Sequence, residues 1–278
     1  MAANQQIIID DLSVRYRGEE TEALKNISVT TGGGQIVGII GNSRSGKTTL
    51  CNILSGIIPN IISGHVSGKV ELCGFSPLED FSEYNFHTGV VLQDTAGQLS
   101  GLSDTVADEI AFGLINQGMS EEEVAERTEA AARQMGLEDQ LQQAPDTLSG
   151  GQTQRLAIAA EVAGNPAFLI MDDPTSQMDP KGRREFFSWL GESSGRTVFI
   201  VSNEIDDLCE IADQLWVLEA GELIASGSPV DVINRVAEGH DLCMPVVYRT
   251  AKKLGRRLEN GLFPVKLAEL ERCFDVHD

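Results

Sequence analysis

The sequence has few basic side chains and no long apolar run, and each shortage excludes a class of protein. Lys and Arg together number 21 against 42 Asp and Glu, which gives a formal net charge of −21 over 278 residues. A surface this acidic repels phosphate backbones, so we expect no nucleic-acid partner. No apolar run reaches the roughly 18 to 20 residues that a helix needs to cross a bilayer, so a membrane role requires a partner.

Signals for disulfides, metal clusters and export are also scarce. The five cysteines form no C-x-x-C pair, and we interpret them as reduced thiols of a cytosolic protein. The four histidines have no ligand-like spacing, and the polar residues 1–6 do not resemble a signal peptide. The residues concerned are Cys51, Cys73, Cys209, Cys243, Cys273, His65, His87, His240 and His277.

The rest of the composition is that of a globular chain, with 41% apolar and 23% charged residues. Short apolar runs predict strands that are buried on both faces, and helical patterns lie between them, so we expect an α/β fold. The predicted strands cover residues 7–14, 35–40, 90–93, 168–171, 197–201 and 214–219.

Helices are predicted where the apolar spacing changes to about four residues. Val106, Ile110 and Leu114 fall on one helix face, and residues 120–123 resemble a capping box. Glycine and proline punctuate the stretch up to about Pro77, where we expect a hairpin. The predicted helices cover residues 47–56, a segment from 105, 121–135 and 152–163.

These elements predict one domain over residues 1–235, with a helical insert at about 94–164. Residues 236–278 differ in character and are expected to form a small C-terminal helical extension. The extension carries a basic cluster at helical spacing, which is either a solvated helix face or a contact with an acidic partner subunit or lipid headgroups. The cluster consists of Arg249, Lys252, Lys253, Arg256 and Arg257.

A glycine-rich loop follows the second predicted strand and opens a helix. Residues 41–48 read G-N-S-R-S-G-K-T and fit the phosphate-loop pattern G-x-x-x-x-G-K-[ST]. The glycines allow a tight turn whose N–H groups point at phosphate oxygens, beside the positive end of the helix. The context disfavours the alternative, a chance glycine-rich turn. The expected ATP-binding residues of the loop are Gly41, Asn42, Ser43, Arg44, Ser45, Gly46, Lys47, Thr48 and Thr49.

Two roles within this loop follow from phosphate chemistry. Lys47 is expected to meet the β- and γ-phosphates of ATP, and the Thr48 hydroxyl is expected to help hold Mg²⁺. A second magnesium ligand is predicted at the end of the buried strand 168–171, where Asp172 and Asp173 emerge together. Asp172 should hold Mg²⁺ directly or through water. A solvated Asp-Asp turn is the alternative, and the nearby phosphate loop disfavours it.

A third motif carries a family resemblance. Residues 148–155 read L-S-G-G-Q-T-Q-R and resemble the signature of ABC ATPases, which likewise stands shortly before the Asp172 strand. Such a segment is a second anion cradle at a helix N-terminus. In that family it caps the γ-phosphate of ATP bound to the other subunit, so the resemblance implies a head-to-tail pair with two composite sites. The residues implied to act on the partner's ATP are Leu148, Ser149, Gly150, Gly151, Gln152 and, in the D-loop 176–179, Asp179.

The resemblance covers about residues 5–230 and implies a P-loop NTPase fold of ABC type with an antiparallel β subdomain. Gln93 resembles the Q-loop glutamine, which contacts Mg²⁺ and senses the γ-phosphate. Tyr16 lies where the family places an aromatic side chain that stacks on adenine, although a strand-edge tyrosine is the alternative.

Finer features resemble the ATPases of energy-coupling factor (ECF) importers. They are the segments 93–99 and 106–114 and a tail with M-P-V at 244–246 and G-L-F-P-V at 261–265. This resemblance implies a groove beside the helix after Gln93 that receives a helix of a transmembrane coupling subunit. A separate membrane subunit then captures the solute, for which vitamin and transition-metal ion both stay open. The chain is expected at the cytoplasmic face of the cell membrane, held there by its partners.

The sequence departs from the ABC pattern at two positions. Asp173 stands where the family has the Glu that polarises the attacking water, so the carboxylate is retracted by one methylene. Misplacement by about 1 Å can lower a rate on the order of 100-fold. Asn203 stands where the family has His, and an amide neither carries a positive charge nor relays a proton. The expected catalytic residues are therefore Gln93 and the altered pair of Asp173 and Asn203.

Two functions from different classes remain open. The chain is either an ATPase with a partly degenerate site that energises import, or a nucleotide-gated clamp that completes the active site of a non-identical ATPase. Both predict a heterodimer with a second ABC ATPase subunit. Tolerated drift, or compensation by a neighbour such as Glu204, is the alternative explanation of the departures. A role on DNA or ribosomes is disfavoured by the net charge and by the absence of a second ATPase repeat.

Overall fold

The computed structural model describes residues 6–95, 97–193, 195–240 and 242–275. Residues 1–5 of the polar start, Ala96 of the ECF-like segment and His277 lie outside the described residues. The strands are β1 (Gln6–Tyr16), β2 (Leu24–Gly32), β3 (Ile36–Ile40), β4 (Gly64–Leu72), β5 (Thr88–Val91), β6 (Phe168–Asp172), β7 (Thr197–Val201), β8 (Gln214–Glu219) and β9 (Glu222–Gly227). The helices are α1 (Lys47–Leu54), α2 (Ile57–Asn60), α3 (Phe81–Phe86), α4 (Val106–Asn116), α5 (Glu121–Met135), α6 (Gly150–Ala163), α7 (Pro180–Glu192), α8 (Ile205–Ile211), α9 (Pro229–Val236), α10 (Val246–Leu254) and α11 (Leu267–Asp275).

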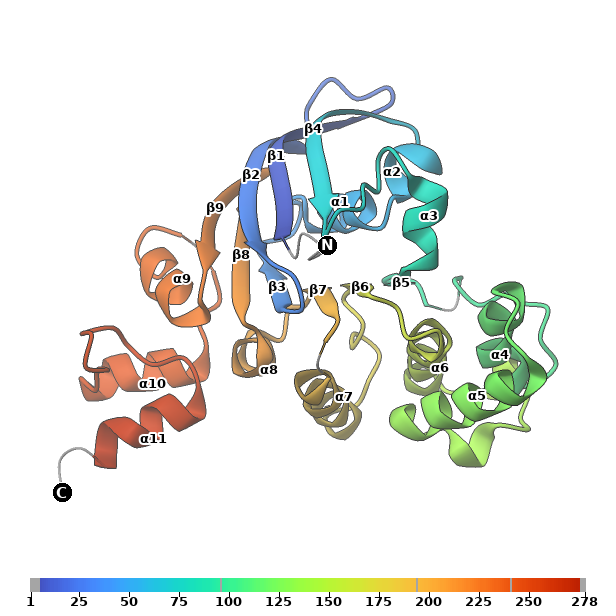
Figure 1. The fold of residues 1–278 in the computed structure, drawn as a ribbon. Coiled ribbons are helices and arrows are strands. Elements are labelled where there is room, and N and C mark those ends of the chain that lie inside the picture. Colours follow the sequence, from blue (N-terminus) through green and yellow to red (C-terminus); the bar gives the residue numbers. More distant parts are fainter. Residues whose placement is uncertain (1–5, 96, 194, 241, 276–278) are drawn as a thin grey trace.

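The strands form two sheets that lie in separate layers (Figure 1). A three-stranded antiparallel sheet of order β2-β1-β4 lies above a six-stranded sheet of order β5-β6-β7-β3-β8-β9. Helix α1 lies between them, and its apolar residues join those of both sheets in one core. The α/β fold with an antiparallel subdomain therefore agrees with the prediction.

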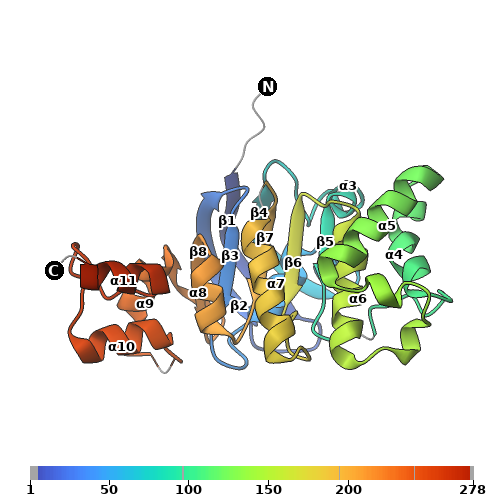
Figure 2. The same cartoon turned by 90° about the horizontal axis from the view of Figure 1, so that it is seen from below.

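The other face of the six-stranded sheet is covered by helices α6, α7 and α8, which lie side by side in Figure 2. Strands β3, β6 and β7 are buried along their whole length. Their alternate residues belong to the two different cores on either side of the sheet. Burial on both faces explains why these strands read as continuous apolar runs in the sequence.

Four neighbouring strands, β5, β6, β7 and β3, run parallel. Their carboxyl ends therefore meet at one edge of the sheet, which is where α/β sheets bind ligands. The chain that leaves these ends contains Gln93, Asp173, Asn203 and Gly41. The fold thus gathers residues that are far apart in the sequence.

Helices α4, α5 and α6 occupy the predicted insert and pack on one another at one end of the molecule. Val106, Ile110 and Leu114 are buried on one face of α4, as their spacing predicts. Ser120 and Glu123 form the expected capping box before α5. Among the described residues, no helix is long and apolar enough to span a bilayer.

Several strands and short helices differ from the prediction or were not predicted. The hairpin expected before Pro77 is instead helix α2 and the single strand β4, which pairs with β1. Strands β2 and β9 were not predicted, because both lie at sheet edges and few of their residues are buried. The short helices α3 and α8 also carry too few turns to show a clear period.

The basic cluster of the tail does not form a single helix face. Helix α10 ends at Leu254, and Gly255 adopts a φ of 68° as its cap. The guanidinium groups of Arg256 and Arg257 lie beyond the helix, 4.9 and 3.9 Å from the ring centres of Phe274 and Phe263. These two arginines therefore pack on aromatic rings of their own tail.

A short hydrogen-bonded bridge joins the tail to the ATPase-like core. Asn234 on α9 donates to the Phe263 carbonyl at 2.8 Å and accepts from the Phe263 N–H at 2.9 Å. One amide side chain thus satisfies both backbone groups of a tail residue.

We predict that Asn234→Ala loosens the tail, because two backbone groups lose their partner at a cost of about 1 to 3 kcal/mol. Proteolytic cleavage near residues 255–262 should become faster, measured on the full chain by mass spectrometry. Asn116→Ala changes an exposed asparagine at the end of α4 and is the matched control. Equal cleavage rates in both variants would show that Asn234 does not fasten the tail.

Candidate functional site

The phosphate loop joins strand β3 to helix α1. Lys47 begins the helix, and its ammonium group donates to the carbonyls of Gly41 and Asn42 at 2.7 and 2.9 Å. The lysine is therefore folded over the loop that it belongs to. Burial lowers the pKa of Lys47, and the carboxylates of Asp172 and Asp173 oppose that shift. The loop thus presents a cation and a helix N-terminus to the same space.

Two glycines of the loop have no room for a side chain. A Cβ on Gly41 would lie 2.2 Å from the Leu218 carbonyl oxygen. Gly46 has a φ of 105°, and a Cβ there would lie 2.7 Å from Leu24 Cδ2 and 2.9 Å from the Ala23 oxygen. Both residues must therefore be glycine for the loop to close against its neighbours.

Alternation along β6 aims Asp172 at the phosphate loop. Phe168 and Ile170 face the core that contains α1, whereas Leu169 and Met171 face the opposite core. Asp172 continues the first set, so its carboxylate lies on the α1 side. There it forms a side-chain hydrogen bond with Thr48, the other residue of this pair that the sequence analysis expects to hold Mg²⁺.

The charge of the site fits a divalent cation. Burial raises the pKa of Asp172, and the Thr48 hydrogen bond and Lys47 oppose this shift. Burial also raises the pKa of Asp173, and the neighbouring Asp172 and Glu204 carboxylates add to that increase. Two crowded carboxylates beside phosphate-binding groups favour a Mg²⁺ ion that is shared with ATP. Thr48, Asp172 and Gln93 would hold it, and the bound ion neutralises charge on the phosphate oxygens.

A second observation in the loop fits a bound nucleotide. The Ser45 hydroxyl is buried and has no hydrogen-bond partner in the part of the chain that the structure describes. Buried polar groups are normally paired, so this hydroxyl is available to a ligand. Among the described residues, no cluster of three His, Cys, Asp or Glu side chains could hold an ion without ATP. Magnesium that is bound by nucleotide phosphates needs no such cluster.

The two residues that depart from the ABC pattern contact each other. The Asn203 side-chain amide donates to Asp173 Oδ2 at 3.2 Å. Asp173 has a φ of 52°, which turns the chain sharply away from the strand. The carboxylate in the position of the expected base is therefore engaged by a neutral amide.

Glu204 has partners of its own. Arg183 on α7 pairs with Glu204 at 2.7 Å and with Asp207 at 3.1 Å. The Glu204 carboxylate is therefore fixed by a cation on a neighbouring helix. This pairing argues against Glu204 as a substitute for the shortened base at Asp173.

The signature lies at the start of α6. Ser149 caps the helix and forms a capping box with Gln152. A Cβ on Gly150 would lie 2.5 Å from the Gln177 side chain, so the signature and the D-loop are in close contact. Asp179 caps α7 by accepting from the Gly182 N–H at 2.7 Å, so its described role is that of a helix cap.

Tyr16 and Gln93 come from different parts of the fold. The Tyr16 hydroxyl lies 3.1 Å from the Thr49 hydroxyl, which places the ring beside α1. Gln93 is exposed and lies two residues beyond the end of β5. Their roles toward adenine and Mg²⁺ stay predictions.

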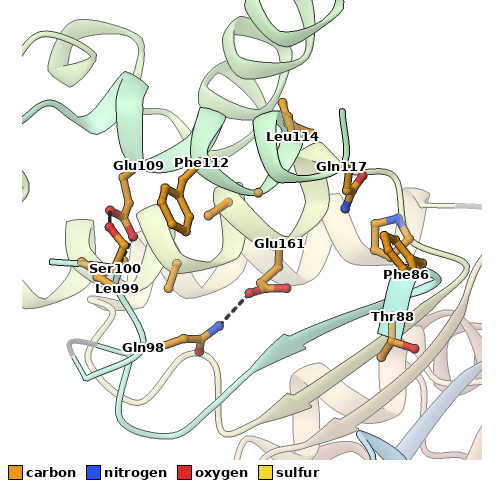
Figure 3. Close-up of a pocket in the computed structure, with 15 residues that line it drawn as sticks. Phe86, Thr88, Gln98, Leu99, Ser100, Glu109, Phe112, Leu114, Gln117 and Glu161 are labelled. Carbon is orange, nitrogen blue, oxygen red and sulfur yellow. Dashed lines mark hydrogen bonds between the residues drawn. The ribbon is translucent and has the colours of Figure 1, made fainter. Parts of the chain in front are cut away.

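A groove lies between α4, α6 and the start of β5 (Figure 3). Its cavity has a volume of about 210 Å³. Phe86 and Phe112 at its wall are 65% and 41% exposed. Exposed aromatic rings at a concave surface make this groove a candidate docking site, and the sequence analysis expects such a groove beside the helix after Gln93.

Sequence reasoning missed three residues of this region. Gln154 is completely buried and connects α6 to the D-loop, since it donates to the Ser176 hydroxyl and accepts from the Gln177 N–H, both at 2.9 Å. Gln98 and Glu161 bind the backbone of β5. A polar residue on the apolar face of a predicted helix was the available signal for Gln154.

We predict that Gly46→Ala lowers the affinity for Mg²⁺-ATP by about tenfold or more, because the new Cβ displaces the loop from Leu24. Isothermal titration calorimetry on the full chain measures this change. Gly74→Ala is the control, since Gly74 has a similar φ of 93° with nothing within 4 Å of its Cβ position. Equal losses in both variants would mean that backbone strain, not the fit of the loop, explains the effect.

Comparisons with known proteins agree with this geometry. The family model described as ABC transporter matches residues 24–176. A putative ABC transporter ATP-binding protein of Pyrococcus horikoshii is 37% identical over 234 residues, which cover 83% of this chain and 82% of the relative. The energy-coupling factor transporter ATP-binding protein EcfA1 of Bacillus subtilis is 35% identical over 94% of this chain and 92% of its own length.

Solved structures show the same similarity. The cbiO1 protein from Clostridium perfringens, described as part of the ABC transporter complex cbiONQ, is 28% identical with a TM-score of 0.72. That match covers 90% of this chain and 96% of cbiO1. The dimeric ATP-binding cassette MJ0796 bound to ADP and Pi is 28% identical with a TM-score of 0.70, over 80% of this chain and 98% of that one. On the phosphate loop, the Asp172 strand, the signature and these similarities, the chain belongs to the ABC transporter ATPases and is similar to those of energy-coupling factor systems.

Proposed function

We propose that this chain is an ATPase subunit of an ECF-type importer whose own site hydrolyses ATP slowly. Its signature completes a second site on a non-identical ATPase subunit. The proposal rests on the similarity to ECF ATP-binding proteins and on the chemistry beside the phosphate loop. The phosphate-binding groups are intact, whereas the groups that would activate water are altered.

The hydrogen bond between Asn203 and Asp173 carries this proposal. A general base must accept a hydrogen bond from the water that attacks the γ-phosphate. The Asp173 carboxylate is one methylene shorter than Glu, and one of its oxygens already accepts from the Asn203 amide at 3.2 Å. Asn203 cannot supply the charge of a histidine. The phosphate loop therefore holds ATP in place, whereas the Asp173–Asn203 pair polarises water weakly.

The intact signature gives the chain a second role. Ser149 caps α6, and the two glycines that follow it form the positive N-terminal end of that helix, which favours an anion. In an ABC dimer this cradle meets ATP on the other subunit. A weak site and a complete signature suit a chain whose partner subunit carries a complete hydrolytic site. We therefore favour a heterodimer.

The membrane partners follow from the same assignment. A helix of a transmembrane coupling subunit would occupy the groove between α4 and α6, and a separate membrane subunit would capture a vitamin or a transition-metal ion. The chain would then lie at the cytoplasmic face of the membrane. The alternative, a nucleotide-gated clamp, is favoured by the same Asn203–Asp173 contact and predicts little hydrolysis at the site of this chain.

We predict that Ser149→Arg lowers ATP turnover of the purified heterodimer more than Lys47→Ala does. The arginine would block the cradle for the partner's γ-phosphate, whereas the loss of Lys47 affects the slow site. Steady-state phosphate release by the assembled complex measures both. Ser120→Arg removes an equivalent helix cap on α5, away from the signature, and is the matched control. The proposal is wrong if Lys47→Ala abolishes turnover while Ser149→Arg leaves it intact.

A second prediction concerns the altered pair. The double substitution Asp173→Glu with Asn203→His should raise single-turnover hydrolysis at this chain's own site by roughly 10- to 100-fold, because it restores the reach and the charge of the water-activating groups. ATP affinity should stay within about twofold, since the phosphate loop is unchanged. Adding Lys47→Ala should remove the gain, which assigns the turnover to this site. An unchanged rate in the double variant would contradict the role of these two positions.

A further inference from the structure

Strand β5 lies at the edge of the six-stranded sheet and pairs with β6 on one side only. The backbone groups on its other side have no strand partner, and such groups require another partner when they are buried. Three of them, the Val90 N–H, the Val90 carbonyl and the Leu92 N–H, are bound by side chains. The chain continues from Leu92 directly into Gln93.

Gln98 takes the place of a neighbouring strand. Its side-chain oxygen accepts from the Leu92 N–H at 2.9 Å, and its side-chain nitrogen donates to the Val90 carbonyl at 2.5 Å. The N–H and C=O groups of a single residue in a parallel neighbouring strand would make the same two bonds. These two bonds join Gln98 to Val90 and Leu92, so Gln93 lies in a loop whose two ends are hydrogen-bonded to each other.

Glu161 anchors this loop to α6. One carboxylate oxygen accepts from the Val90 N–H at 3.0 Å, and the other accepts from the Gln98 amide at 3.0 Å (Figure 3). Burial raises the pKa of Glu161, and these two hydrogen bonds oppose the shift. An acid on the floor of the groove thus connects the signature helix with the strand that leads to Gln93.

A second carboxylate in the groove provides a contrast. Glu109 on α4 accepts from the N–H and the hydroxyl of Ser100, both at 2.6 Å. Ser100 lies seven positions after Gln93, and none of these bonds reaches β5. Both acids line the same groove, but only Glu161 is bonded to the strand that leads to the nucleotide site.

We propose that Glu161 and Gln98 are positioning residues that hold Gln93 in register with the magnesium end of the nucleotide site. Through them the floor of the groove and the signature helix act on the strand that leads to Gln93. The inference rests on the proposed role of Gln93 toward Mg²⁺-ATP. Without this clamp the end of β5 has unsatisfied backbone groups, and Gln93 samples other positions.

The clamp is tested by comparing ATP binding with Mg²⁺ and ATP binding in EDTA on the full chain by calorimetry. Glu161→Ala and Gln98→Ala should each weaken Mg²⁺-ATP binding by about fivefold or more. Binding of ATP in EDTA should remain within about twofold, since the phosphate loop is intact. Gln93→Ala should show the same magnesium-specific loss, and Glu161→Ala should add nothing to it, because the two act as one unit.

Two further variants separate positioning from general damage. Glu161→Gln keeps one acceptor oxygen in the clamp and should therefore lose less Mg²⁺-ATP affinity than Glu161→Ala. Glu109→Gln alters the same groove and should leave it unchanged. Amide hydrogen exchange at Val90 and Leu92 should become about tenfold faster in Glu161→Ala and stay unchanged in Glu109→Gln.

Three results would overturn the clamp: equal losses with and without Mg²⁺, an added loss on top of Gln93→Ala, or faster exchange at Val90 with normal Mg²⁺-ATP binding. Failure of the proposed function gives a different result. In that case Gln93→Ala itself would show no magnesium-specific loss, whatever happens at Glu161.

Discussion

Burial of both faces of the six-stranded sheet is the constraint on which the nucleotide site depends. Because β3, β6 and β7 are fully buried, their side chains alternate between two cores, and this alternation directs Asp172 toward Thr48. Parallel pairing then brings the carboxyl ends of these strands to one edge. The phosphate loop, the Asp172–Asp173 segment and Asn203 therefore lie at one edge of the sheet, although they are far apart in the sequence.

The features that could be predicted from the sequence are those formed by residues close together in the chain. A glycine loop between a strand and a helix, or a capping box such as Ser149 with Gln152, is determined by residues that are near one another in the chain. Strands β7 and β8 were predicted with the bounds that the structure has, because each is a continuous apolar run. Asp179 is different, since a family position suggested contact with ATP whereas its side chain caps α7.

Contacts between distant segments could not be predicted. The hydrogen bond from Asn203 to Asp173 joins residues 30 positions apart, and it changes the meaning of both substitutions. Gln98 and Glu161 were not identified because satisfying the edge of β5 is a property of the folded sheet. The edge strands β2 and β9 were missed because half of each strand lacks the apolar character of a buried run. These features share one cause, which is that their partners come from elsewhere in the chain.

In the proposed function, this chain's nucleotide site keeps its phosphate-binding groups but activates water weakly. The central claim of that proposal is that the two composite sites of the assembled complex differ in chemistry. The direct measurement is a single-turnover quench on the complex purified through this chain and loaded with labelled ATP, in which bound ATP and released phosphate are counted per complex. The account predicts two ATP bound, one hydrolysed rapidly and one retained. Rapid hydrolysis of both in the same phase would contradict it.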